Sequence, residues 1–240
     1  MHLKQMIIKW IHMTKPLPTK QRIIDVAGEI FGKHGFKSAT IRKIAIAANA
    51  NIASINYHFR DKEGLYRAVL EDIFSTGFKK FPSAVRSEKN SGPDQRLHTF
   101  IRAMFHRFLS MEGWQGISGG RGRLITREFF DPTPAFEDIV DTYIKPQKDI
   151  LVSILSDLSH GNDSMNQLLP CAISIIGQCV YYAFAEPIIK RLAKDFAPTQ
   201  DNLDRLADHV FLFSLGGLQQ INKAPVNRLW DDANNREEKL

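Results

Sequence analysis

The sequence predicts an all-α fold, in which an N-terminal three-helix head with a helix-turn-helix motif is joined by a helix to a larger C-terminal helical body. Apolar residues recur at helical spacing from Thr19 to about residue 222, and no stretch shows a strand pattern. Between Thr40 and Phe59, two such apolar segments are separated by only a few polar residues. Two helices joined by so short a turn are typical of a helix-turn-helix unit.

Composition and charge describe an ordinary globular protein with a basic front. The 240 residues are 43% apolar and 24% charged. Residues 1–67 hold 12 Lys/Arg and 4 Asp/Glu, whereas the remainder holds 20 and 22. A basic segment before a near-neutral body indicates a head that faces a polyanion, although a merely solvated basic surface would have the same composition.

Residues 1–18 are predicted to be a flexible basic extension. Lys9 interrupts the apolar run after two isoleucines and no small-residue cleavage site follows, so we do not interpret the segment as a secretion signal. It is either an arm that adds phosphate contacts or sequence upstream of a start at Met13. No run approaches the ~20 apolar residues of a membrane helix, and we expect a cytoplasmic protein.

The two cysteines and the absent motifs argue against a redox or catalytic centre. Cys171 and Cys179 lie eight residues apart in one helical segment, which separates them by ~12 Å and forbids a disulfide between them. We expect both to be reduced and buried. No metal-ligand spacing, G-x-S-x-G or H-E-x-x-H is present, so the sequence predicts no cofactor, no metal and no enzyme.

The head is predicted to span residues 19–66. Its first helix covers Thr19–Lys33 and is expected to end at Gly35. The second begins after Thr40, a plausible N-cap. Its core face has apolar residues at i, i+3, i+4 and i+7, namely Ile41, Ile44, Ala45 and Ala48.

The second helix of the motif follows the break at Asn49–Asn51, and Asn51 is expected to cap it. Ile55 and Phe59 fall on its inner side. The opposite side carries Ala53, Ser54, Tyr57 and His58, which leaves them free to enter a DNA major groove. A further helix, capped by Asp61, should connect the head to the body without a loose linker.

The body is predicted to span residues 67–225, followed by a polar tail at 226–240. We expect a loop at Phe81–Gln95, a flexible glycine stretch at residues 116–122, a sharp break that supplies the next N-cap at residues 131–134, and a kink at Pro146. Between them, a helix should bury one apolar face, made of Leu97, Ile101, Met104, Phe105 and Phe108.

The last two predicted helices, Cys171–Leu192 and Leu206–Ile221, lack a clean polar face. Both should therefore be buried on more than one side. A symmetric dimer through these helices explains this most simply, because cyclic dimers dominate among oligomers.

Residues 19 to about 74 resemble the TetR/AcrR family of bacterial transcriptional repressors. The likeness lies in AGEIFGKHGFKSATIRKIA and ANANIASINYHFRDKEGLY, while INYHF, EFFDPTPAF and YIKPQ resemble its CecR-like branch. The family usually has Gly near Ala53 and Tyr at the position of Asn56. The resemblance implies an all-α homodimer whose ligand-binding C-terminal domain changes the spacing of two heads on a palindromic operator. A ligand-independent, chromosome-organising DNA-binding protein of the same fold is the alternative.

The candidate DNA contacts fall into two sets. Hydroxyl and basic side chains at helix starts are the usual phosphate contacts, and polar side chains of the second helix can reach bases. The alternatives are a plain helix cap or a solvated surface for the phosphate set, and a buried capping role for Asn56. The expected phosphate contacts are Thr40, Arg42, Lys43 and Lys62, and Lys62 also matches a phosphate contact of the family. The expected base or groove contacts are Ile52, Ala53, Ser54, Asn56, Tyr57 and His58.

Aromatic and polar residues of the body are candidates for lining the pocket of a small-molecule effector, because ligand cavities combine aromatic walls with a few polar groups. Plain core packing is the competing interpretation for each. The candidates are Phe105, His106, Trp114, Arg127, Tyr143, Gln178, Tyr181 and Tyr182.

Overall fold

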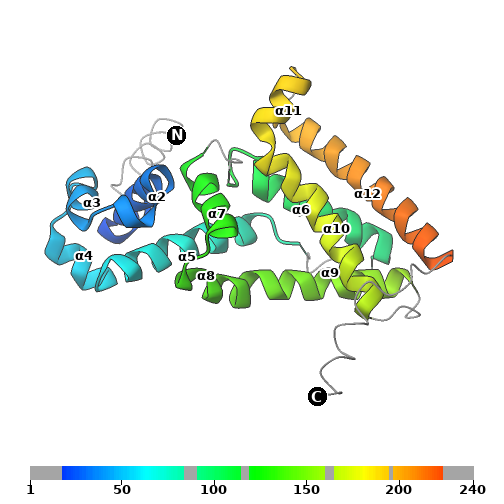
Figure 1. The fold of residues 1–240 in the computed structure, drawn as a ribbon, viewed down its shortest axis with the longest axis horizontal. Coiled ribbons are helices and arrows are strands. Elements are labelled where there is room, and N and C mark those ends of the chain that lie inside the picture. The colour runs from blue at the N-terminus through cyan, green and yellow to red at the C-terminus, as the bar shows by residue number, and fades with distance from the viewer. Residues whose placement is uncertain (1–17, 84–90, 115–118, 160–164, 195–196, 224–240) are drawn as a thin grey trace, which may run out of the picture.

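The computed structural model describes residues 18–83, 91–114, 119–159, 165–194 and 197–223. Every regular element within those ranges is a helix, which confirms the all-α prediction (Figure 1). The predicted tail at 226–240, and the predicted extension up to residue 17, lie outside the described residues.

The head lies at one end of the molecule, and one long helix leads from it into the body (Figure 1). A Gly35 φ of 77° interrupts the first helix at the predicted break, in a region that glycine adopts readily. One more turn then carries that helix to Ser38. The helices are α2 (Thr19–Ser38), α3 (Ile41–Ala47), α4 (Ile52–Phe59) and the connecting α5 (Lys62–Lys80).

The body surrounds the far part of α5. In Figure 1, α8 begins beside the far part of α5 and continues through η2 into α9, which packs against α6 and α10. Helix α7 stands between head and body, and α12 forms an outer edge. The elements are α6 (Pro93–Leu109), α7 (Gly120–Phe130), α8 (Pro134–Ile139), the π-helical turn η2 (Val140–Ile144), α9 (Lys145–Leu158), α10 (Met165–Phe184), α11 (Glu186–Leu192) and α12 (Gln200–Lys223).

One apolar core runs through both parts. Phe31 of α2, Ile55 of α4 and Leu65 of α5 are fully buried in the same cluster as Phe105 of the body. Burial of an apolar side chain of this size contributes ~1.5–3 kcal/mol, so the cluster joins head and body firmly. The predicted inner face of α6 is buried in full.

Asp131 follows the last residue of α7 and Thr133 occupies the N-cap position of α8, within the break predicted at residues 131–134. Two other features differ from the sequence prediction for local reasons. The irregular turn expected at Pro146 lies just before it, in η2, because proline lacks the N–H of a regular turn. The segment Cys171–Leu192 is two helices, broken at Ala185, because Pro187 cannot donate to the carbonyl four residues back.

Two glycines of the predicted flexible stretch, Gly120 and Gly122, are instead buried within α7. A Cβ atom on Gly32 would lie 2.2 Å from the Gly120 carbonyl oxygen. These glycines therefore serve the close approach of α2 and α7. Cys179 is buried as predicted, whereas Cys171 is only half-buried.

The segment Gln167–Phe184 of α10 is long and apolar enough to cross a membrane by length and composition, contrary to the sequence prediction. The core helix of a soluble protein passes the same test. Ala172, Ile175 and Cys179 of this helix belong to the apolar core, and α10 packs against α6 and α9. One face of α10 therefore belongs to the core, although only 33% of the segment is buried, and a single helix of this kind is weak evidence for a membrane span.

Candidate nucleic-acid interface

Hydrogen bonds within the turn and from α2 hold the turn between α3 and α4. Asn49 has a φ of 46°, a left-handed conformation that asparagine tolerates. Asn51 caps α4, since its Oδ1 accepts a hydrogen bond of 2.6 Å from the Ser54 N–H. From α2, Arg22 donates its Nε–H to the Ala48 carbonyl at 2.8 Å. The two helices of the motif therefore have a fixed relative orientation.

The start of α3 places three predicted phosphate contacts together on the surface. Thr40 is the N-cap, and its hydroxyl oxygen accepts from the Lys43 N–H at 3.2 Å. Thr40, Arg42 and Lys43 are all exposed. A hydroxyl and two cationic side chains in this position have the chemistry of a phosphate-binding edge.

Helix α4 has a buried side and an exposed side, as its helical periodicity predicts. Ile55 and Phe59 are buried, while Tyr57 is 84% exposed and its ring contacts that of His58. The Asn56 side chain is exposed too, so a buried capping role does not apply to it. Of the remaining predicted groove residues, Ile52 and Ala53 are exposed, whereas Ser54 and His58 are half-buried.

Lys62, at the start of α5, has a structural role that sequence reasoning missed. Its Nζ donates to the carbonyls of Phe36 and Ala39, at 3.2 and 3.4 Å. The ammonium lies 4.3 Å from the centroid of the Phe36 ring. Lys62 therefore joins the start of α5 to the segment that leads into α3. Asp61 caps α5 as predicted, by accepting from the Gly64 N–H at 2.7 Å.

Ile46 of α3 is a further surface candidate that sequence reasoning missed. It is 73% exposed, although it belongs to a helix whose Ile44 and Ala45 are buried. The available signal was its place outside the i, i+3, i+4, i+7 stripe of that helix. Together with the exposed Ile52, it adds apolar surface that can contact thymine methyl groups.

A small cavity can be described in the body, and the predicted effector pocket as a whole stays a prediction. A cavity of about 10 Å³ lies between α6, α7 and α10, and Trp114 is the one predicted residue that lines it. That is room for about one water molecule. Phe105 and His106 are buried, Tyr143, Gln178 and Tyr182 are half-buried, and Arg127 and Tyr181 are exposed. The cavity is lined by Phe108, Trp114, Gly122, Ile125, Thr126, Ala183 and Phe184.

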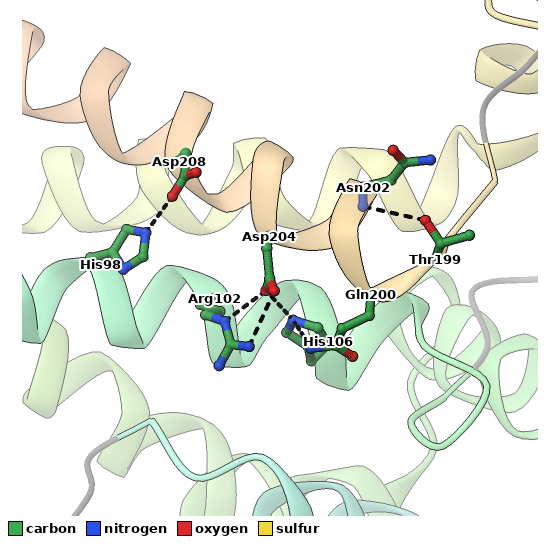
Figure 2. Close-up of polar contacts among 8 residues, drawn as sticks. All are labelled: His98, Arg102, His106, Thr199, Gln200, Asn202, Asp204 and Asp208. Carbon is green, nitrogen blue, oxygen red and sulfur yellow. Dashed lines mark hydrogen bonds and ion pairs between the residues drawn. The ribbon is translucent and has the colours of Figure 1, made fainter.

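His106 takes part in a polar seam that joins α6 to α12 (Figure 2). Its Nε2 lies 2.7 Å from Asp204 Oδ1, and the Arg102 Nε donates to the same oxygen at 2.6 Å. About two helical turns before His106 on α6, His98 Nε2 lies 2.7 Å from Asp208 Oδ1. Burial acts to raise the pKa of Asp204, but the hydrogen bonds and charges of Arg102 and His106 outweigh it and leave that pKa below its usual value.

Helix α7 is bonded to the head near both of its ends. Near its start, the Arg121 Nη2 lies 3.4 Å from Asp25 of α2 and 3.4 Å from Asp72 of α5. Near its end, the Glu128 carboxylate accepts a hydrogen bond from the Tyr66 hydroxyl of α5. A helix of the body thus makes polar contacts with two helices that position the motif.

A capped helix-turn-helix with an exposed second helix, carried on a larger helical body, defines a DNA-binding transcriptional regulator. Residues 23–69 match the model of the bacterial regulatory proteins of the tetR family, and residues 93–218 match the C-terminal domain of the HTH-type transcriptional dual regulator CecR. The chain belongs to the TetR family and has the CecR-type C-terminal domain.

Individual relatives agree with this assignment. The chain is 26% identical over 178 residues to the transcriptional dual regulator CecR of Shigella flexneri, covering 71% of this chain and 78% of that protein. It is 22% identical over 169 residues to the probable regulator YttP of Bacillus subtilis, covering 70% and 78%. In fold it is similar to FadR of Bacillus subtilis in complex with stearoyl-CoA, with a TM-score of 0.60 at 16% identity, covering 82% and 98%.

Proposed function

We propose that this regulator is a cytoplasmic homodimeric repressor, which a small-molecule effector releases from a palindromic operator. The observation that carries the proposal is the position of α7. Arg121 and Glu128 of this helix bond to the head, while Ile125 and Thr126 of the same helix line the cavity in the body. An effector that enlarges this cavity displaces α7, and its bonds transmit the displacement to the head.

The proposed DNA contacts keep their two sets. The exposed basic edge of α3 and the start of α5 supply the phosphate contacts, and the outer side of α4 supplies the base contacts. With no arginine and no acidic residue on that side, much of the specificity would come from DNA shape. The phosphate set is Thr40, Arg42, Lys43 and Lys62, and the groove set is Ile52, Ala53, Ser54, Asn56, Tyr57 and His58.

The proposed dimer forms through the outer faces of α10 and α12. Tyr181 of α10 and Leu212 and Phe213 of α12 are exposed in the single chain, Phe213 at 66%. A Cβ atom added to Gly177 or Gly216 would meet nothing within 4 Å, so partner helices can approach these backbones closely. Two copies related by a two-fold axis can place their α4 helices in successive major grooves, ~34 Å apart.

Footprinting of the purified protein on the DNA beside its own gene, together with a genome-wide occupancy map, tests this function. We expect one palindromic footprint and few occupied sites. Tyr57→Ala should change the preference among operator variants, because Tyr57 is the most exposed aromatic side chain of α4. Many dispersed sites, unaffected by any small molecule, would instead support a chromosome-organising protein.

The proposed dimer has its own test. Leu212→Asp places a charge on the outer face of α12, and analytical ultracentrifugation should then report a monomer. The matched control is Asp201→Asn, which removes an exposed charge from the first turn of the same helix. A dimer that persists in Leu212→Asp would contradict the assignment of the interface.

A further inference from the structure

Arg107 of α6 is a buried cation surrounded by neutral groups. Its side chain lies in the interior, with 2% of the residue exposed. The Nη2 donates to the Phe81 carbonyl at 2.8 Å and to the Ser83 hydroxyl at 2.7 Å. The guanidinium carbon lies 3.9 Å from the centroid of the Phe78 ring. None of these three partners carries a negative charge.

Arg107 differs in this respect from other arginines of the body. Arg96, Arg102 and Arg121 are more exposed, and each lies within ion-pair distance of an aspartate. In the part of the chain that the structure describes, no ion pair involves Arg107, and its Nε has no hydrogen-bond partner. Burial lowers the pKa of the guanidinium to about 9, and no neighbouring charge offsets it. A buried charge is costly unless it is paired, so an unpaired one in this position indicates a missing anion.

We propose that Arg107 binds the carboxylate of an amphipathic effector, whose apolar part inserts between the aromatic side chains beside it. This proposal rests on the ligand-responsive function proposed above and names the chemical class of the ligand. The guanidinium suits a carboxylate because its planar N–H donors match the two oxygens.

The surroundings of Arg107 lead toward the cavity at Trp114. Phe78, under the guanidinium, stacks on Tyr143 at 5.4 Å and contacts the Trp114 ring edge-on at 6.2 Å. Trp114 in turn lines the cavity against α7. An aromatic wall with one charged group at its end is typical of small-molecule sites, where a few polar or charged groups fix the orientation of the ligand. Filling this space pushes on the helix that is bonded to the head.

A structural role for Arg107 makes the opposite prediction. Phe81 follows the last residue of α5, so Arg107 also donates to a carbonyl at the negative end of that helix. If this capping contact is the reason for the arginine, its charge stabilises the free protein. If the site binds an external anion, the unpaired charge destabilises the free protein.

Thermal unfolding of the full-length protein and its Arg107→Met variant distinguishes these roles. Met retains much of the apolar stem without the charge. We expect Arg107→Met to have an unchanged or higher Tm without ligand. A fall of several degrees would overturn the proposal and leave Arg107 as a helix cap. The control is Arg102→Met on the same helix, which removes an exposed guanidinium already paired with Asp204.

Ligand class is tested with acids and the alcohols of the same carbon skeleton, namely butyrate, octanoate and 3-phenylpropionate beside butanol, octanol and 3-phenylpropanol. We expect at least one acid to raise the Tm of the wild type and of Arg102→Met, and its matched alcohol not to. Its affinity should fall about tenfold or more in Arg107→Met, as expected for lost hydrogen bonds to a charged group. Equal shifts from acids and alcohols, or no shift from any acid, would overturn the assignment.

Two further arms separate this inference from its alternatives. Glu88 lies five residues after Ser83 in the sequence, outside the described residues. If Glu88→Gln lowers the Tm of the wild type but not that of Arg107→Met, then Glu88 is the counter-ion of Arg107 and the proposal fails. Fluorescence anisotropy on operator DNA tests the regulator itself. Absent DNA binding with an intact acid response would refute the proposed function alone.

Discussion

Tyr66 of α5 donates its hydroxyl hydrogen bond to the carboxylate of Glu128 in the last turn of α7, and both side chains are buried. The same carboxylate accepts from the Thr133 backbone N–H and hydroxyl, each at 3.0 Å. Glu128 is only 1% exposed. It therefore connects the helix that leaves the head to the turn between α7 and α8, and it depends on these donors to remain buried.

Removal of the Tyr66 hydroxyl should destabilise this connection. Tyr66→Phe keeps the ring but leaves the buried carboxylate one donor short, so we expect the free energy of unfolding in urea to fall by about 1–3 kcal/mol. Tyr57→Phe removes an exposed hydroxyl and should change it by no more than about 0.5 kcal/mol. Equal effects of the two variants would show that the Tyr66–Glu128 bond contributes little.

The same pair predicts a dependence on alkaline pH. Burial, followed by the hydrogen bond and charge of Glu128, raises the pKa of Tyr66. The folded state then holds the phenolic proton more tightly than the unfolded chain, in which tyrosine has a pKa of about 10. This contribution to stability is full below pH ~10 and is lost as the pH rises above that value. Urea titrations at pH 8 and pH 11 should show that the free energy of unfolding falls less between these two pH values in Tyr66→Phe than in the wild type.

The close contact between α2 and α7 predicts opposite effects for two neighbouring glycines. In Gly32→Ala, the new Cβ would lie 2.2 Å from the Gly120 carbonyl oxygen, so the helices must separate. We expect a loss of about 1–3 kcal/mol in the free energy of unfolding, as is typical of overpacking. In Gly28→Ala, the Cβ would meet Val69 at 3.5 Å, an ordinary contact. That variant should be neutral or more stable by up to about 1 kcal/mol, since alanine favours helices.

The helical pattern of the head could be predicted from sequence because it depends on local signals. The caps at Thr40, Asn51 and Asp61 are formed by short polar side chains that accept from the N–H group three residues ahead, and each is present as predicted. The inward positions of Ile55 and Phe59 follow from helical periodicity alone.

Contacts between distant segments could not be predicted in the same way. The sequence predicts flexible glycines at the start of α7 and gives no sign that Gly120 approaches Gly32, which lies 88 residues earlier in the chain. The sequence places His106 among the pocket candidates and gives no sign of its partner Asp204, which lies 98 residues later. Lys62 donates to the backbone carbonyls of Phe36 and Ala39, and no sequence pattern indicates these bonds. Composition indicates that such groups need partners, and only the fold determines which.

The seam between α6 and α12 predicts a dependence on acidic pH. Asp204 keeps a pKa below its usual value, despite burial, through Arg102 and His106. Its contribution to stability is therefore present above pH ~4, the usual value for an unfolded aspartate, and is lost as the pH falls through the lower folded value. Asp204→Asn should be less stable than the wild type at pH 6, and the difference should shrink toward pH 3. A constant difference would show that Asp204 acts through packing.

The last prediction separates the two roles of Lys62 at the head. Lys62→Met removes the ammonium that bonds to the Phe36 and Ala39 carbonyls, so the free energy of unfolding should fall by about 0.5–1.5 kcal/mol. If Lys62 also contacts a phosphate, the dependence of operator affinity on salt should flatten by ~1 unit of slope.

Arg42→Met is the matched control, because Arg42 is exposed on α3 and should alter the salt slope without altering stability. Fluorescence anisotropy at salt concentrations from about 50 to about 300 mM gives the slopes. Urea denaturation gives the stabilities. A Lys62→Met variant that lost stability but kept the wild-type slope would show that Lys62 has a structural role in the head and no phosphate contact. The phosphate edge would then consist of Thr40, which also caps α3, and of the exposed Arg42 and Lys43.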